Sequence, residues 1–243
     1  MKVSTAVATP SPRSLRARDK LMHTAERLYA EHGFANVSIR MIREAAGQRN
    51  KSAVQYHFST RDELIQAILA RHAAEIDRLR APMVAELESS GEVSRRDRIA
   101  CVIAPSIEHH IELGTPSWYG RFLAQAVVEP SLRDYTTEAN VTTPSFQRLE
   151  QLRPPRGQER DPELFERHAS MTRLLIVHMC AELEGDLATG RVDPATAERS
   201  WRELGETLVT AVCGLSSALL DQETDPAAGQ GVVSGGGGGG PGG

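Results

Sequence analysis

Residues 49–56 bring cationic, amide, hydroxyl and small apolar side chains together within a short stretch. Such side chains match base-pair edges in the DNA major groove, where Arg or Lys pairs with guanine, Asn or Gln with adenine, and small apolar groups contact thymine. A recognition helix also carries small or polar residues at its leading end, so that its backbone can approach the bases. We therefore predict that this stretch reads DNA, with base contacts from Lys51, Ser52, Ala53 and Gln55, preceded by Arg49 and Asn50.

Phosphate contacts are predicted from polar residues around this stretch, because contacts to the DNA backbone fix the register of a bound protein. The predicted phosphate contacts are Ser38, Arg40, Tyr56, His57 and Arg61. Alternatives stay open for several of them. Arg40 is equally well a solvated helix charge, Tyr56 can be a packing residue, and a lone His57 is more often a polar contact than a pH switch.

Charge is distributed unevenly along the 243 residues. Residues 13–61 hold ten Lys or Arg against four Asp or Glu, a net charge of +6, whereas residues 62–243 hold 17 against 28, a net charge of −11. A basic head on an acidic body is typical of a protein that binds a polyanion, although a chance cluster of solvated charge gives the same count. Arg13, Arg16 and Arg18 are predicted to add phosphate or minor-groove contacts from a mobile arm.

Apolar residues recur at helical spacing almost throughout the chain, and no alternating strand pattern is present. The first three helices are predicted over residues 15–32, 39–46 and 50–58, the second of them capped by Ser38. Thr60 opens a capping box before a long helix that reaches about Arg80. Four helices are therefore expected within the first eighty residues.

Later helices are predicted over residues 95–113, 117–128, 163–189 and 195–220, with further helix between 131 and 152. The last three of the four begin at a polar cap followed by proline, at residues 115–116, 161–162 and 193–194. Pro105 should bend or break the first. The expected fold is all-α with about nine helices, divided into a disordered basic-ended arm (1–13), a three-helix helix-turn-helix head (14–60), a helical body (61–222) and a disordered Gly-rich tail (223–243).

Several spacings between residues 18 and 69 resemble the N-terminal domain of the tetracycline-repressor (TetR) family. The matching features are Ala25, Leu28-Tyr29, Gly33-Phe34, Val37-Ser38-Ile39, Ile42, Ala46-Gly47, Tyr56-His57-Phe58 and Arg61-Asp62-Glu63-Leu64. The resemblance implies a DNA-binding homodimer that reads a palindromic operator with one head per half-site. Gln55 stands where the family usually has Tyr, and the turn after Gly47 is one residue longer, so base preference cannot be carried over.

The last two helices resemble the pair that forms a four-helix bundle with a second copy in this family. Each carries an apolar stripe, and Gly205 and Gly214 permit the close approach of another helix. The predicted dimer contacts are Leu174, Leu183, Trp201, Leu204, Leu208, Val212, Leu215 and Leu219. The alternative is a core within one chain.

A ligand pocket is predicted among the middle helices, where apolar residues are joined by a few polar groups, as in most small-molecule sites. The predicted lining residues are Ile103, Ile107, His110, Trp118, Phe122, Ala126, Met171, Leu175 and His178. For each of them the alternative is ordinary packing, because apolar helical stripes usually form core.

The function expected from these features is a transcription regulator, a repressor that leaves its operator when a small apolar ligand shifts the helix beginning at Arg61. Two recognition helices must lie about 34 Å apart, so a small shift is enough to prevent simultaneous docking. Activation of transcription stays open. So does a DNA-binding dimer controlled by a protein partner, or without any small-molecule inducer, which a filled core would favour.

No catalytic residue, metal site or cofactor is predicted. Residues 214–218 form a degraded nucleophile-elbow pattern, but it lies inside a helix with no preceding strand. His109 and His110 point to different sides of a helix, so a metal shared with Cys101 is disfavoured, as is one held by His178 and Cys180. Three isolated cysteines, the absence of a long apolar run and the lack of a hydrophobic leader favour a cytoplasmic location.

Overall fold

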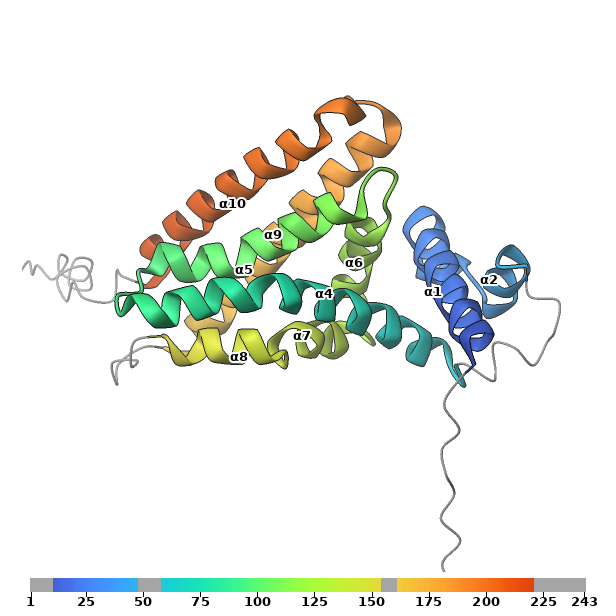
Figure 1. The fold of residues 1–243 in the computed structure, drawn as a ribbon, viewed down its shortest axis with the longest axis horizontal. Coiled ribbons are helices and arrows are strands. Elements are labelled where there is room, and N and C mark those ends of the chain that lie inside the picture. The colour runs from blue at the N-terminus through green and yellow to red at the C-terminus, as the bar shows by residue number, and fades with distance from the viewer. Residues whose placement is uncertain (1–10, 48–57, 154–160, 221–243) are drawn as a thin grey trace, which may run out of the picture.

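The structure, a computed structural model, describes residues 11–47, 58–153 and 161–220. These ranges hold nine α-helices and two short 3-10 turns, with no strand among them, which confirms the predicted all-α class. The helices are α1 (Pro12–His32), α2 (Ile39–Ala45), α4 (Arg61–Ser90), α5 (Arg95–Leu113), α6 (Tyr119–Val128), α7 (Arg133–Val141), α8 (Pro144–Gln151), α9 (Pro162–Thr189) and α10 (Ala197–Leu220). We call α1 with α2 the head and α4 to α10 the body. Figure 1 shows the head at one end, with α4 running from it along the whole body.

The head begins earlier than its sequence pattern predicts. Ser11 caps α1 by accepting a hydrogen bond from the Ser14 amide at 3.3 Å, so the helix starts at Pro12. Arg13, Arg16 and Arg18 therefore belong to α1, and the prediction that they form a mobile arm is wrong. At this position a polar cap followed by proline starts the helix, and it outweighs the polar composition that suggested disorder.

The helix-turn-helix geometry follows from local signals that the sequence makes plain. Gly33 ends α1 with φ of 81°, a backbone conformation that a side chain would disfavour. Ser38 then caps α2 by accepting from the Met41 amide at 3.3 Å, as predicted. The two head helices and the first turns of α4 close over Leu21, Tyr29 and Ile42, which are completely buried.

The connecting helix α4 is longer than predicted. Thr60 accepts from the Glu63 amide at 3.1 Å, which confirms the predicted cap, while Glu63 accepts from Ser59 rather than from Thr60. The helix then continues past the expected end near Arg80 to Ser90. Its Pro82 is exposed, so the carbonyl it leaves unpaired can meet water, and Val84 beyond it is fully buried. Tertiary packing thus carries the helix through a residue that normally ends one.

Helix α6 does not begin at its predicted cap. The predicted cap at Thr115, followed by Pro116, does not open this helix, which begins at Tyr119. Its first amide donors are instead taken by the carboxylate of Glu184 from α9, with Gly120 N donating at 3.0 Å and Arg121 N at 3.0 Å. A side chain 64 residues away has replaced the local cap.

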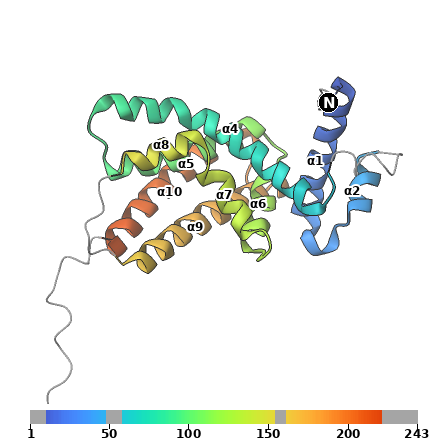
Figure 2. The same ribbon diagram turned by 90° about the horizontal axis from the view of Figure 1, so that it is seen from below.

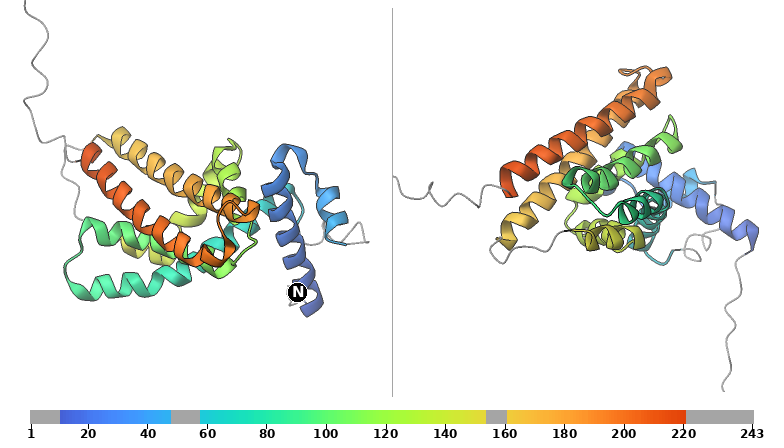
Figure 3. Two further views of the ribbon diagram at one scale, coloured as in Figure 1. Left: turned by 90° about the horizontal axis from the view of Figure 1, so that it is seen from above. Right: turned by 60° about the vertical axis from the view of Figure 1, so that its left-hand side comes forward.

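Helices α5, α9 and α10 begin at or within two residues of their predicted starts, and α7 and α8 lie within the helical region predicted between residues 131 and 152. Asp161 and Asp193 each accept from the second following amide at 2.9 Å, opening α9 and the 3-10 turn (Pro194–Thr196) that precedes α10. Pro105 does not break α5, which is continuous from Arg95 to Leu113. Figures 2 and 3 show α9 and α10 side by side on the side of the body away from α8.

One segment, Pro194–Leu220, is long and apolar enough to cross a membrane by length and composition alone, with a mean hydropathy of 1.3. It packs along α5 and α9 in this structure. A single helix of this kind does not indicate a membrane protein, because helices that bury one face in a soluble protein pass the same test.

Within the described part of the chain, three apolar clusters hold the helices together. The largest runs without interruption from head to body, from Leu21 and Ala25 of α1 to Phe122 and Ala126 of α6. A second joins α5, α9 and α10 around Trp201, and a small third one joins α4, α5 and α8. Because the first cluster contains both head and body residues, movement of one part must disturb packing in the other.

The stability of the second cluster should depend on pH through His110. This ring stacks on Trp201 at 4.4 Å, and burial lowers its pKa to about 3. The unfolded chain, with an ordinary histidine pKa of 6.5, then binds more protons than the folded chain between these values, so stability falls as pH decreases.

We expect His110→Phe, which keeps an aromatic ring on Trp201, to reduce the loss of unfolding free energy between pH 7.5 and 5.5 by about 1 kcal/mol. Urea unfolding at the two pH values measures this. Any packing cost of the larger ring is the same at both pH values and cancels in the difference. An unchanged difference would show that His110 protonates freely in the folded protein.

Candidate nucleic-acid interface and its junction with the body

Apart from the three arginines of α1, three of the residues predicted to contact DNA lie in the described ranges, and they have different environments. The Ser38 hydroxyl oxygen caps α2 by accepting a hydrogen bond from the Met41 amide. Arg40 lies on the exposed surface of the same helix, where its Nε donates to Glu44 at 2.8 Å and its side chain is 78% exposed. The others, which include every predicted base contact, lie outside the described residues; they are Arg49, Asn50, Lys51, Ser52, Ala53, Gln55, Tyr56 and His57.

Arg61 is placed differently from a freely solvated phosphate ligand. Its guanidinium lies 5.6 Å from the ring centroid of Tyr29 and 5.5 Å from that of Phe34. Both rings belong to the head, whereas Arg61 is the first residue of α4. The cation-π contacts therefore attach the start of α4 to the head.

An aromatic contact joins the head to α6. Phe122 of α6 lies 6.3 Å from Tyr29 and 5.6 Å from Phe34, measured between ring centroids, and is completely buried. Beside it the Gln125 side chain donates to the carbonyl of Ala30 at 3.3 Å. The head therefore packs directly on α6, and α6 is held in turn by Glu184 of α9.

Glu184 is a buried carboxylate with a full set of donors. It is 2% exposed and accepts from the Ser117 hydroxyl, two backbone amides of α6 and the Arg121 guanidinium, at 2.9 to 3.1 Å. A negative charge at a helix N-terminus is favoured by the exposed amides and the helix dipole. This contact fixes the end of α6 to α9, so the body helices position the surface on which the head rests.

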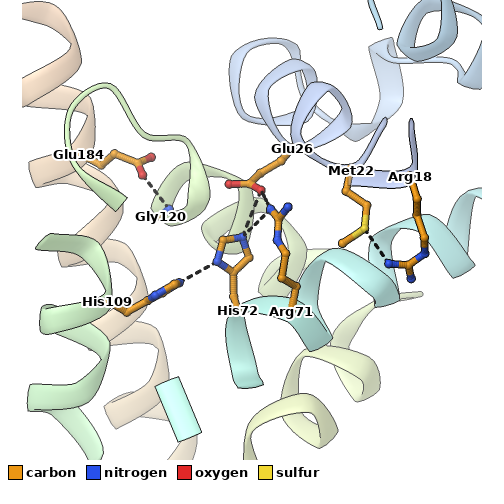
Figure 4. Close-up of polar contacts among 8 residues, drawn as sticks. All are labelled: Arg18, Met22, Glu26, Arg71, His72, His109, Gly120 and Glu184. Atoms are coloured by element: carbon orange, nitrogen blue, oxygen red, sulfur yellow. Dashed lines mark hydrogen bonds and ion pairs between the residues drawn. The ribbon is translucent and has the colours of Figure 1, made fainter. Parts of the chain in front are cut away.

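A second buried carboxylate attaches α1 to α4 (Figure 4). Glu26, whose side chain is 4% exposed, accepts from Arg71 at 2.5 Å and contacts Nε2 of His72 at 3.1 Å. Burial alone would raise the pKa of Glu26, but the hydrogen bond with His72 and the charges of His72 and Arg71 hold it below its usual value. Nδ1 of His72 in turn lies 2.7 Å from Nε2 of His109 on α5. We call Glu26, Arg71, His72 and His109 the junction network.

The comparisons with known proteins agree with this head. Residues 21–68 match the model for bacterial regulatory proteins of the tetR family. The chain carries a tetR-family head. Over 71 residues it is also 30% identical to the HTH-type transcriptional repressor AcnR of Corynebacterium efficiens. That alignment covers 29% of this chain and 37% of the relative, so it extends over little more than a third of that protein.

The residues predicted to line a pocket in the body are not brought together. Ile103, Ile107 and Leu175 belong to the cluster of α5, α9 and α10, and His110 stacks on Trp201 beside them. Phe122, Ala126 and Trp118 belong instead to the cluster shared with the head. Met171 is 48% exposed and His178 is exposed as well. Helical spacing shows which residues share a face but not which neighbouring helix that face meets.

The predicted dimer contacts divide into residues buried in the core of the single chain and residues that remain exposed or half-buried. Trp201, Leu208 and Val212 are each 2% exposed inside the chain's own core, so in this arrangement they are not available to a second chain. Leu174 is 37% exposed on α9, and Leu183, Leu204, Leu215 and Leu219 are half-buried. The stripe on α10 is wide enough to face both α5 and solvent, and the sequence alone did not separate these two faces.

The side chains considered for an enzyme or a metal site contact other residues of the protein. Ser216 donates to the carbonyl of Val212 at 2.8 Å and lies 2.8 Å from His168, so its proton is used within α10. His109 faces His72, whereas His110 faces Trp201. Over residues 11–47, 58–153 and 161–220, no group of three or more His, Cys, Asp or Glu is arranged to hold a metal ion.

The junction network was missed by the sequence analysis, although a signal for it exists. Glu26 lies among the buried residues of α1, and His72 continues the apolar series of Ile65, Ile68 and Leu69 on α4. A titratable residue within an apolar helical stripe must find a buried partner. The sequence identifies such residues, but it does not identify the partner.

We expect Glu26→Gln to lower the free energy of unfolding by about 2 kcal/mol, because hydrogen bonds to a buried charge contribute more than neutral ones. Glu44→Gln is the matched control, since it removes a carboxylate from an exposed ion pair of the same head, and we expect a change of less than about 0.5 kcal/mol. Denaturant unfolding of both variants measures the two values. Equal effects would mean that the junction network does not stabilise the protein.

Proposed function

We propose that this protein is a sequence-specific DNA-binding transcription regulator, a repressor that binds a palindromic operator as a homodimer. The observation that carries the proposal is the tetR-type head, matched over residues 21–68 and folded with its Ser38 and Thr60 caps in place. The similarity to a transcriptional repressor, confined to 71 residues, points to the same class. The net charge of +6 over residues 13–61 supports binding to a polyanion.

A homodimer is supported by the apolar residues that the single chain leaves in contact with solvent. Met171, Leu174 and Met179 on α9 are 48%, 37% and 37% exposed. Gly214 on α10 has no heavy atom within 4 Å of the position where a Cβ would lie, so a second helix can approach there. Apolar patches of this kind usually mark an interface. Two copies joined through α9 and α10 would place one head on each half-site.

Control of DNA binding has two candidate forms. In the first, a small ligand in the body shifts α4 and alters the separation of the two heads, which must remain about 34 Å apart. In the second, a protein partner acts on the dimer, or no inducer acts at all. The residues predicted to line an apolar pocket are split between two packed clusters. This observation favours the second form for that part of the body.

The decisive experiment selects binding sites from a pool of random duplexes, using the full chain and the double variant Lys51→Ala with Gln55→Ala. We expect the wild type to enrich a palindrome and the double variant to lose that preference, at a cost of about 2 kcal/mol or more. Arg167→Ala with Gln147→Ala is the matched control, because both residues are exposed in the body, and it should enrich the same palindrome.

Repeating the selection across salt concentrations separates specific from electrostatic binding. Binding that falls steeply with salt and shows no preferred sequence would contradict a specific repressor. Absence of binding would contradict it as well. A palindrome that the double variant still enriches would show that the base contacts are made by residues other than Lys51 and Gln55.

The dimer is tested separately with Leu174→Glu. A charge buried without a partner is strongly unfavourable, so we expect the dissociation constant of the dimer to rise at least about tenfold. Leu15→Glu is the control, because Leu15 is 48% exposed but lies on α1 in the head. Sedimentation velocity without DNA measures both variants. An unchanged dimer in Leu174→Glu would show that α9 is not the interface.

A further inference from the structure

The first turns of α1 extend beyond the core of the head. The helix begins at Pro12, but its first buried residue is Leu21, and none of residues 11–20 is buried. The match to the family model also begins only at residue 21. This part of α1 therefore depends on its local start signals, the Ser11 cap and the proline that follows it, more than on burial. We call residues 12–20 the α1 extension.

Three cations form a stripe along the α1 extension. Arg13, Arg16 and Lys20 are spaced by three and four residues, so they lie on one face of the helix, and all three are exposed. They span about 10 Å along the helix axis. The extension as a whole holds four Lys or Arg residues against one carboxylate, Asp19, a net charge of +3. We call Arg13, Arg16 and Lys20 the basic stripe.

The basic stripe disfavours the helix that carries it. Arg16 and Lys20 are four residues apart, a spacing at which like charges destabilise a helix, and the first turn has no acidic residue to match the helix dipole. Elsewhere in the head, Arg27 and Arg40 pair with the glutamates four residues later at 3.1 and 2.8 Å. Within the described part of the chain, no cation of the stripe forms such an ion pair. An anion from outside the chain would offset these repulsions.

The α1 extension lies beside both ends of the segment predicted to read DNA. Nζ of Lys20 is 3.7 Å from the position that a Cβ of Gly47 would take. The Arg18 guanidinium is 5.0 Å from the ring centroid of Phe58. Gly47 and Phe58 are the described residues on either side of residues 48–57, which include every predicted base contact. The basic stripe therefore begins next to the part of the head that would meet the bases.

Arg18 has a different environment from the basic stripe. Its guanidinium donates to Sδ of Met22 at 3.2 Å and covers Phe58, and the side chain is half-buried (Figure 4). These contacts hold Arg18 within the head. We therefore assign Arg18 to packing, and Lys20, which the sequence analysis did not select, to the surface that faces a ligand.

We infer that the basic stripe is a second DNA contact, which binds phosphates beside the bases that residues 49–56 read. The inference rests on the proposed DNA-binding function and adds to it a rigid helical contact in place of a mobile arm. A mobile arm would follow the minor groove, whereas a helix holds its cations in fixed directions along the backbone. Phosphate contacts carry no base information, so the stripe would raise affinity without changing the preferred palindrome.

The charge contribution is tested with Arg13→Ala combined with Arg16→Ala, measured by fluorescence anisotropy on a labelled duplex. A dimer loses four cations, so the slope of log affinity against log salt should become shallower by about 3 to 4. Affinity at about 0.1 M salt should fall at least about tenfold, with the same palindrome enriched. Arg96→Ala combined with Arg133→Ala removes equal charge from exposed positions on α5 and α7, and its slope should change by less than about 1.

The rigidity of the contact is tested with Ala17→Pro, which keeps every charge but breaks the helix within the stripe. We expect this variant to lose as much affinity as the double arginine variant, because Arg13 and Arg16 would no longer be held in line with Lys20. Ala17→Ser, which leaves the helix intact, is the control and should bind as the wild type does. Circular dichroism, together with enrichment of the same palindrome, verifies that the head remains folded from Leu21 onward.

Four results would each overturn the inference: an unchanged salt slope in the double arginine variant, an equal change in its control, a different palindrome, or full affinity in Ala17→Pro. The slopes are also compared on a duplex without the palindrome, since phosphate contacts need no particular sequence. Failure to enrich a palindrome would therefore contradict the proposed repressor and still leave the stripe tested. Absence of binding to any duplex would contradict both.

Discussion

The burial of Glu26 beneath α4 constrains the whole arrangement of head and body. A carboxylate that is 4% exposed must keep its cationic and hydrogen-bonding partners, because an unpaired buried charge is far more costly than an exposed one. Those partners, Arg71 and His72, lie on the helix that runs through the entire body. The head cannot rotate freely on α4 without separating these groups, so the orientation of the helix-turn-helix is set by the body.

A second carboxylate extends this constraint to the far side of the body. Glu184 holds the N-terminus of α6 against α9, and α6 presents Phe122 to the aromatic residues of the head. Helix α9 also carries the exposed apolar residues through which we propose that two chains join. A change at that face can therefore reach the head through rigid contacts, by way of α6 on one side and the junction network on the other.

The sequence predicted local structure well and tertiary structure poorly. Caps at Ser38, Thr60, Asp161 and Asp193 were predictable, because each depends on a side chain and an amide two or three residues apart. The end of α4 and the start of α6 were not, since one is extended by packing around Val84 and the other is capped from another helix. Dependence on tertiary packing also explains why the residues predicted to line one pocket are not brought together. Helical periodicity gave the buried faces of α5, α6 and α9 but not their division into two clusters.

The chemistry of the junction explains why it is suited to control. An apolar interface tolerates small displacements gradually, whereas a network of ion pairs and hydrogen bonds is made or lost over a few tenths of an ångström. The head of this protein is held by both, through Phe122 and the apolar cluster on one side and through Glu26 on the other. The apolar contact would keep head and body associated when the polar one is broken. The head would then turn on α6 without detaching, and in the dimer that we propose such a turn would change the separation of the two heads.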